Sequence, residues 1–257
     1  MGEAIQYECS NNIAWIRLNR TDKLNSFNEI MHKEMLLALK DAERNQEVRC
    51  IVITGNGRAF SAGEDLEGVT DDLDHGEVIR SRYTPVILQI SRSKKPIVSA
   101  VNGVAAGSGL SLALACDFRL LHEKAKLVQA FIHVGLIPDS GNLFYLPKLI
   151  GHAKAMELAV FGEKISSQQA MELGLATKVI TEDAWDNEVQ SFALTLACLP
   201  TKAFGLIKEQ LSRSWEMPLD EFLEAESYSQ RIAGLSYDHK EGVIAFKEKR
   251  KPDFQGN

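Results

Sequence analysis

The sequence predicts an α/β layered fold. Buried strands rich in β-branched residues, such as CIVIT and IVSAV, alternate along the chain with amphipathic helical patterns. With 257 residues, the chain is long enough to bury a sizeable apolar core without disulfides or a structural metal. Its hydrophobic share of 45% and charged share of 25% are ordinary for a globular protein and exclude a disordered, collagen-like or coiled-coil chain.

The first quarter of the chain alternates strands with one helix. Residues 5–18 hold two short alternating runs, which predict a hairpin around a Ser-Asn-Asn turn. Apolar residues recur at helical spacing over residues 28–44 and predict an amphipathic helix. Residues 50–54 predict a buried strand, which ends at the turn-forming Gly55–Gly57, and a short strand and a loop follow.

The middle of the chain continues the alternation. Residues 72–93 show an uneven helical pattern that we expect Pro85 to interrupt. Residues 97–101 predict a second buried strand, which opens into a glycine-rich turn and a helix over residues 110–115. Two further strands, FRLLH and KLVQA, precede residue 131.

From about Pro138 the sequence predicts helices, with one more strand at ATKVI. Ser166 is expected to cap the helix SSQQAMEL, which Gly174 ends. A boundary near Leu199–Pro200 predicts an α/β core over residues 1–199 and a C-terminal helical region over residues 200–257.

Charge and composition exclude several classes of partner and site. The net charge of −6 and the isoelectric point near 5.6 argue against nucleic-acid binding, which needs clustered positive charge. Residues 96–116 carry no charge and are long enough to cross a bilayer. Their proline, asparagine, glycines and serines instead favour a strand, a turn and a buried helix, so we expect no membrane partner. The scattered histidines and cysteines predict no metal site. The N-terminal residues show no secretory signal, and the separated cysteines suit a reducing cytoplasm.

Two turns, at residues 55–66 and 102–113, share one pattern: a buried strand, then small residues, then the start of a helix. Small residues let a ligand approach the backbone, and a pair of free N–H groups aimed at one point makes an oxyanion hole. The alternative is a pair of tight turns that only pack closely. A dinucleotide fingerprint is incomplete, because Leu112 stands where its third glycine belongs.

Four segments resemble the enoyl-CoA hydratase/isomerase (crotonase) superfamily: AFSAGEDL, KPIVSAVNGVAAGSGLSLALACDFRLL, HVGLIPDSG and the C-terminal EGVIAFKEKRKPDFQG. The resemblance runs in order from about residue 5 to the end of the chain. It implies a spiral of repeated ββα units and a C-terminal helical region that packs the chain into a homotrimer, or a hexamer made of two trimers. It also implies an acyl-CoA thioester as substrate, with coenzyme A as part of that substrate and no other cofactor.

The resemblance also places the binding site. The thioester carbonyl is expected between the backbone N–H groups of Glu64 and Ser108. Residues 64–67 are expected to border the adenine or ribose of coenzyme A. The neighbouring positions expected to bind substrate are Ala62, Gly63, Asp65, Leu66, Gly107 and Gly109.

The acid or base is the remaining question. Hydratases of this family place two glutamates where this sequence has Ser111 and Phe131, so water addition by the usual route is in doubt. Asp139 stands nearby in LIPDSG, where some isomerases of the family carry an aspartate. These include isomerases that convert a ring epoxide of phenylacetyl-CoA to an oxepin and isomerases that shift a 3,4 double bond to the 2,3 position. From the residues alone, Asp139 is equally a turn residue that caps the following helix.

Three functions follow from these patterns. The first is an acyl-CoA isomerase in which Asp139 is the single acid/base. The second is a 2-enoyl-CoA hydratase that uses an acid other than the two usual glutamates. The third is a non-catalytic acyl-CoA-binding protein with the same fold.

Overall fold

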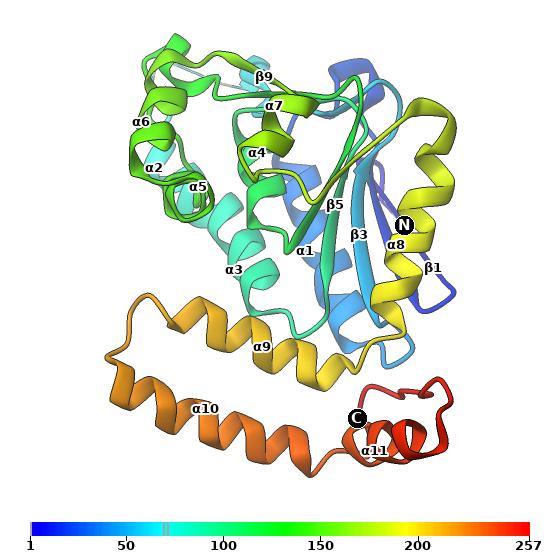
Figure 1. Cartoon of the computed structure of the whole chain (residues 1–257). Coiled ribbons are helices and arrows are strands. Elements are labelled where there is room, and N and C mark those ends of the chain that lie inside the picture. The colour runs from blue at the N-terminus through cyan, green and yellow to red at the C-terminus, as the bar shows by residue number, and fades with distance from the viewer. Residues whose placement is uncertain (1, 69, 71) are drawn as a thin grey trace.

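The computed structural model describes residues 2–68, 70 and 72–257. Figure 1 shows a layered α/β body with a separate layer of helices at its C-terminal end. Within the described residues, the larger sheet has the strand order β1-β2-β3-β5-β7-β10 and the smaller sheet the order β4-β6-β8-β9. The strands of the larger sheet are β1 Ile5–Ser10, β2 Ile13–Leu18, β3 Cys50–Gly55, β5 Ile97–Val101, β7 Phe118–His122 and β10 Lys178–Ile180. Those of the smaller sheet are β4 Ala59–Ser61, β6 Val104–Ala106, β8 Lys126–Val128 and β9 Lys164–Ser166.

The chain visits the two sheets in turn, and this alternation builds the spiral. Strand β3 in the larger sheet leads to β4 in the smaller one, β5 leads to β6, and β7 leads to β8. These pairs repeat in parallel, β3 beside β5 beside β7 and β4 beside β6 beside β8. The carboxyl ends of β4 and β6 therefore meet at one edge of the smaller sheet, the place where α/β proteins bind ligands.

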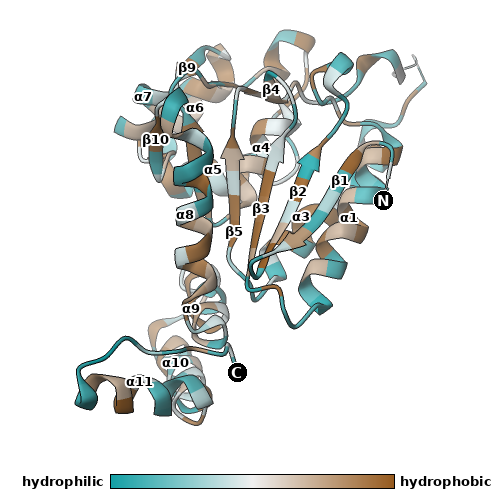
Figure 2. Ribbon diagram, turned by 90° about the vertical axis from the view of Figure 1, so that its right-hand side faces the viewer, coloured by the Kyte–Doolittle hydropathy of each residue, from teal (hydrophilic) through white to brown (hydrophobic). Residues whose placement is uncertain are grey.

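The larger sheet is covered on both faces, which explains its nearly continuous apolar strands. Side chains such as Ile51 and Ile53 of β3 pack with α1 and α3 on one face, whereas Cys50 and Val52 pack with α8 on the other. Figure 2 shows the resulting band of hydrophobic residues along the strands. The helices are α1 Glu29–Arg44, α2 His75–Val78, α3 Thr84–Arg92, α4 Ser108–Ala115, α5 Asn142–Ile150, α6 His152–Phe161, α7 Ser167–Glu172, α8 Trp185–Ala197, α9 Thr201–Arg213, α10 Leu219–Gly234 and α11 Tyr237–Glu248.

Local signals place several helix ends where the sequence predicts them. The Asn28 side chain accepts a hydrogen bond from the Met31 N–H at 2.9 Å and caps α1. Ser166 and Gln169 form a reciprocal capping box at the start of α7, and Gly174 follows the helix in the left-handed region. The predicted start and stop of this helix are confirmed.

Four features differ from the sequence prediction. Strands β6 and β9 were not expected, because runs of three residues are too short to show a period. Residues 75–92 are not interrupted at Pro85: α2 continues through a π-helical turn, Ile79–Tyr83, into α3, whose first turn accommodates the proline. Helix α4 begins at Ser108, two residues earlier than predicted, so its N-terminus lies inside the glycine-rich turn.

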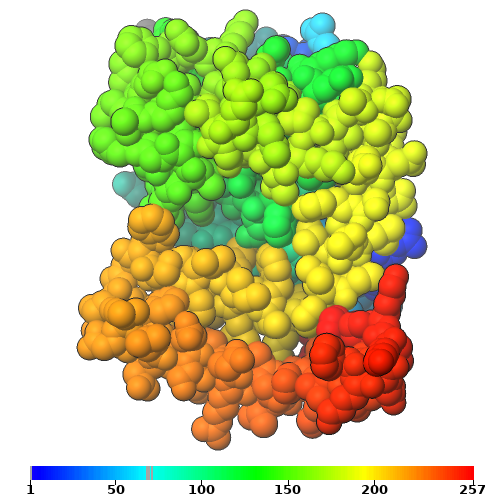
Figure 3. All heavy atoms as spheres, in the orientation of Figure 1, coloured from blue at the N-terminus to red at the C-terminus, as the bar shows by residue number. Residues whose placement is uncertain are grey.

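The C-terminal helices α9, α10 and α11 form the lower layer in Figures 1 and 3. The Lys208 ammonium group joins α9 to the body, because it donates to the Asp117 carboxylate at 3.0 Å and to the Ile90 carbonyl at 2.8 Å. This layer also exposes a row of large apolar side chains: Ile207, Leu211, Trp215, Leu219, Leu223, Tyr228, Leu235 and Phe246.

Residues 96–116, which have the length of a membrane span, form β5, β6 and the fully buried α4. In the described part of the chain, no single helix has both the length and the apolar character to cross a membrane. One bent pair of helices, Glu182–Ala197 with Thr201–Arg213, meets both criteria only when the two are taken together.

Candidate active site

The two glycine-rich turns lie against each other at the carboxyl ends of β4 and β6. The parallel register of these strands pairs Ala59 with Val104 and Ser61 with Ala105, which brings the following residues together. Gly63 has a φ of +97°, and a Cβ there would lie 2.9 Å from the Ala106 carbonyl oxygen and 3.6 Å from the Ser108 nitrogen. Glycine is required at this point by both conformation and space.

Local hydrogen bonding leaves the two expected amides available to a ligand. The Phe27 N–H donates to the Gly63 carbonyl at 2.7 Å, and the Asp65 N–H donates to the Phe27 carbonyl at 2.9 Å. This parallel bridge directs the N–H of the intervening Glu64 away from Phe27. Ser108 is the first residue of α4, whose first-turn N–H groups have no partner within the helix. The positive end of the α4 dipole adds to the attraction for a negative atom.

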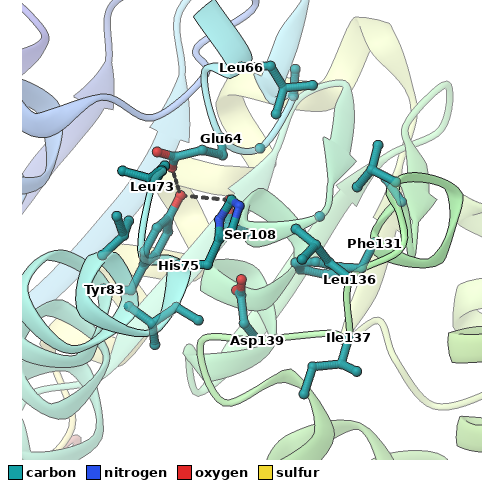
Figure 4. A pocket seen from close by; sticks show the side chains of 17 residues that line it. Glu64, Leu66, Leu73, His75, Tyr83, Ser108, Phe131, Leu136, Ile137 and Asp139 are labelled. Carbon is teal, nitrogen blue, oxygen red and sulfur yellow. Dashed lines mark hydrogen bonds between the residues drawn. The ribbon is translucent and has the colours of Figure 1, made fainter. Parts of the chain in front are cut away.

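A cavity of about 260 Å³ adjoins these turns. Figure 4 shows it from close by, with the side chain of Asp139 pointing from one wall toward His75 and Ser108. Its polar side chains are those of Glu64, His75, Tyr83, Ser108 and Asp139. Its apolar walls are formed largely by Leu73, Val78, Ile79, Phe131, Leu136 and Ile137.

Asp139 lies in the tight turn that precedes α5 and is half-buried. The Ser140 hydroxyl donates to its carboxylate at 2.8 Å, and the Asn142 N–H donates to its backbone carbonyl at 2.9 Å. The turn is strained, because Ser140 has a φ of 54° and Gly141 follows at 78°. Burial raises the pKa of Asp139, and the negative charge of Glu64 adds to this rise against the opposing hydrogen bond from Ser140.

Asp139 does not cap the helix that follows it. The N-cap position of α5 is Gly141, and no side chain caps that end. The capping role that the sequence allowed for Asp139 is therefore wrong, whereas its predicted place in a turn is confirmed. Its carboxylate lines the cavity.

The two positions that hold glutamates in hydratases contribute no carboxylate. Phe131 presents its ring to the cavity wall. Ser111 is fully buried in α4, outside the cavity, and joins a buried polar chain. In this series of hydrogen bonds, the Gln129 amide donates to the Asn142 side chain at 3.0 Å, and Asn142 donates to the Ser111 hydroxyl at 3.2 Å. The Ser111 hydroxyl in turn donates to the Gly107 carbonyl at 3.3 Å.

The other residues expected to bind substrate divide into two groups. Those that line the cavity are Ala62, Gly63, Leu66 and Gly107. Asp65 and Gly109 lie outside it. The Arg20 guanidinium donates to the Asp65 carboxylate at 2.8 Å and lowers its pKa, and Gly109 packs so closely on Ser61 that a Cβ there would lie 2.7 Å from the Ser61 carbonyl oxygen. Substrate contact by these two residues stays a prediction.

Three residues of the site were not singled out from the sequence. Tyr83 and His75 line the cavity, and His32 lies behind Tyr83, with its Nε2 atom 3.9 Å from a Glu64 carboxylate oxygen. The π-helical turn that ends at Tyr83 has no simple sequence signature, and only the fold brings α1 and this turn together. Over the residues that the structure describes, no group of three or more His, Cys, Asp or Glu side chains is arranged to hold a metal ion.

Comparison with known proteins finds relatives that span nearly the whole chain. The family model described as enoyl-CoA hydratase/isomerase matches residues 8–257. The chain is 40% identical to the 1,2-epoxyphenylacetyl-CoA isomerase of Escherichia coli, with 100% of both chains covered. It is 32% identical to the trans-2-decenoyl-[acyl-carrier-protein] isomerase of Streptococcus mutans, with 98% of each chain covered. The crystal structure of a protein assigned as an enoyl-CoA hydratase/isomerase from Mycobacterium abscessus superposes with a TM-score of 0.93 at 36% identity, and covers 99% of this chain and 100% of its own.

The fold and the comparisons thus define an enzyme of a class that acts on CoA thioesters. The chain belongs to the enoyl-CoA hydratase/isomerase family. The family resemblance and the spiral α/β fold expected from the sequence are both confirmed.

Proposed function

We propose that this enzyme is an acyl-CoA isomerase with Asp139 as its single acid/base. It shifts a 3-enoyl double bond to the 2-position, or opens a ring epoxide of an acyl-CoA ester, through an enolate. The observation that carries this proposal is the position of Asp139, whose carboxylate faces the cavity opposite the paired turns. The two hydratase positions, Ser111 and Phe131, offer no acid.

The double-bond shift moves one proton and one pair of electrons. The Asp139 carboxylate takes a proton from the carbon between the thioester and the double bond, and the C–H electrons move onto the carbonyl oxygen. The amides of Glu64 and Ser108 donate to that oxygen, which carries the negative charge of the enolate. Asp139 then returns the proton to the γ carbon as the new double bond forms. A raised pKa suits Asp139 to both steps.

The cavity walls indicate the acyl group. Leu73, Phe131 and Ile137 belong to an apolar lining that suits an aliphatic or aromatic acyl chain. The E. coli relative is named for an epoxide of phenylacetyl-CoA and the S. mutans relative for a decenoyl ester, which supports both versions of the reaction. Coenzyme A enters as part of the substrate, and no other cofactor takes part.

Turnover of trans-3-hexenoyl-CoA by the wild type and by Asp139→Asn tests this function. We expect the wild type to form the 2-enoyl ester and Asp139→Asn to lose at least about 10²-fold in kcat, the scale of acid/base catalysis. Asp183→Asn is the matched control, because Asp183 is exposed on the 3₁₀ turn Glu182–Ala184 and does not line the cavity. Full activity in Asp139→Asn would contradict the assignment.

Other products would replace the proposal with one of its alternatives. Faster water addition to trans-2-hexenoyl-CoA than isomerisation of the 3-enoyl ester would identify a hydratase. Tight binding of CoA esters without turnover of enoyl, dienoyl or epoxide substrates would identify a binding protein.

The assembly forms part of the same proposal. We infer that α9 to α11 pack three copies of the chain into a trimer, or into a hexamer of two trimers. The exposed apolar side chains of this layer, which include Leu211, Trp215 and Leu219, support an interface there. The mass in solution by light scattering tests this inference, and a monomer at micromolar concentration would overturn it.

A further inference from the structure

One side-chain cluster beside the paired turns has no part in the proposed reaction so far. The Tyr83 hydroxyl donates to a carboxylate oxygen of Glu64 and lies 3.0 Å from the Ser108 hydroxyl. Figure 4 shows both hydrogen bonds. Tyr83 thus connects the side chains of the two residues whose amides are expected to bind the thioester oxygen.

Tyr83 is held firmly in this position. It is 5% exposed, it ends the π-helical turn Ile79–Tyr83, and its ring contacts those of His32 and Phe27 edge-on, with centroids 4.1 and 5.8 Å away. Insertions of this kind into a helix redirect side chains and occur often at functional sites. Burial and the neighbouring Glu64 charge raise the pKa of Tyr83 well above its usual range, so it remains a phenol that donates.

The buried His32 lies beside Tyr83, near the same carboxylate oxygen of Glu64. Its Nε2 atom is 3.9 Å from a Glu64 oxygen, its ring is 3% exposed, and within the described structure that atom has no hydrogen-bond partner. A buried polar atom without a partner costs free energy, and groups of this kind are found at functional sites.

We propose that Tyr83 and Glu64 are a pair of positioning residues, in which the Tyr83 hydroxyl holds the Glu64 carboxylate, as a fixed negative charge, at the wall of the cavity that Asp139 also lines. This inference rests on the proposed function, because it assigns the pair to the acid/base of that reaction. The fixed charge opposes ionisation of Asp139 and so helps to keep its pKa raised. The family resemblance requires only the backbone amide of Glu64. The proposed pair also assigns a role to the Glu64 side chain, as a charge that acts on Asp139.

The hydrogen bond from Tyr83 has a second consequence. A free carboxylate next to two unpaired amides would itself be a suitable anion for them. Because Tyr83 binds the Glu64 carboxylate, the amides of Glu64 and Ser108 remain open to the thioester oxygen.

A titration of Asp139 tests the pair without relying on turnover. The carboxyl carbon of Asp139 is followed by carbon-13 NMR in the wild type, Glu64→Gln and Glu77→Gln, with the resonance assigned by its loss in Asp139→Asn. We expect the midpoint to move to lower pH by about half a unit or more in Glu64→Gln, because a like charge is removed. Glu77→Gln is the matched control: Glu77 is exposed on α2 and pairs with Arg80 at 2.6 Å, so the midpoint should not move.

The titratable groups near enough to influence the charge of Asp139 are Glu64, Tyr83, His32 and His75. The two histidines and the tyrosine are the same in all three titrated proteins, so the difference between the midpoints reports on the Glu64 charge. An unchanged midpoint in Glu64→Gln overturns the pair.

Kinetics of Tyr83→Phe provide the second test. We expect kcat/KM for the 3-enoyl ester to fall about tenfold in Tyr83→Phe, and most of this loss to be recovered when Glu64→Gln is added. Tyr145→Phe removes a hydroxyl from a partly buried tyrosine outside the cavity and should leave kcat/KM unchanged. A double variant as slow as Tyr83→Phe, or slower, overturns the role of Tyr83. The two proposals can fail separately. If Glu64→Gln shifts the Asp139 midpoint but the wild type does not isomerise the 3-enoyl ester, the proposed function is refuted and the pair remains. If the wild type isomerises the ester but Glu64→Gln leaves the midpoint unchanged, the pair is refuted and the proposed function remains.

Discussion

Gly63→Ala perturbs the paired turns at the point where they touch. Gly63 has a φ of +97°, and an added Cβ would lie 2.9 Å from the Ala106 carbonyl oxygen. Carbon and oxygen atoms in ordinary contact are about 3.5 Å apart, so one backbone must retreat by about half an ångström or more. The obstacle is backbone, which cannot rotate away as a side chain can. Ala106 precedes Ser108 by two residues, so the displacement reaches the amide that is expected to bind the enolate oxygen.

The expected loss has two parts. A non-glycine residue at this φ costs about 1–3 kcal/mol of stability. Misalignment of one donor in an oxyanion hole lowers kcat by about 10²–10³-fold. Since the displacement separates the Glu64 and Ser108 amides without removing either, we expect kcat to fall by about 10²-fold.

Steady-state isomerisation of trans-3-hexenoyl-CoA and thermal unfolding measure the two parts separately. Gly151→Ala is the matched control, because Gly151 has a φ of +79° but no atom within 4 Å of an added Cβ. It should lower Tm and leave kcat near the wild-type value. If Gly63→Ala kept kcat within about twofold of the wild type, the inference that the paired turns bind the enolate oxygen would be refuted.

Three further predictions follow from the structure. Burial raises the pKa of Asp139, so its ionisation destabilises the folded state above that pKa. Asp139→Asn should therefore raise Tm at pH 7, and this gain should vanish as the pH falls below the pKa of the carboxyl in the unfolded chain. Scanning calorimetry at the two pH values measures both effects. Asn142→Ala breaks the buried chain between Gln129 and Ser111 and should cost about 1–3 kcal/mol of unfolding free energy; an unchanged denaturation midpoint would contradict that chain. Leu211→Glu places a charge on an exposed apolar helix and should reduce the mass in solution by light scattering, whereas an unchanged trimer would locate the interface elsewhere.

Sequence reasoning located the paired turns because their signals are local. Gly63 and Gly107 follow buried strands, and both have positive φ values that glycine adopts at little cost. Asp139 was also found, but the sequence left two roles open. Only the structure shows that Gly141 occupies the N-cap position and that the carboxylate faces the cavity.

The residues that sequence reasoning missed depend on contacts across the fold. Tyr83 reaches Glu64 and Ser108 from a π-helical turn, and His32 joins them from α1. No periodicity in the chain relates positions 32, 64, 83 and 108. Strand β9 was missed for a similar reason, because its three residues form a strand only where β8 offers an antiparallel partner.

The position of Gly109 shows a different limit of the sequence. It follows Ser108 directly and packs against Ser61, outside the cavity lining, so its expected contact with substrate stays a prediction. Proximity in the sequence does not separate a residue that faces the ligand from one that supports the turn. Successive residues of a helix point in different directions, and only the packing of α4 decides which of them reaches the cavity.

Exchange of α-hydrogen tests the central claim, enolate formation by Asp139, without a choice of physiological substrate. Phenylacetyl-CoA can lose a proton next to its carbonyl but has no double bond to shift, so incubation in deuterium oxide followed by mass spectrometry reports enolate formation alone. We expect the wild type to incorporate deuterium at the α carbon, and Asp139→Asn to do so at least about 10²-fold more slowly. Equal exchange by the two proteins would show that another group removes the proton.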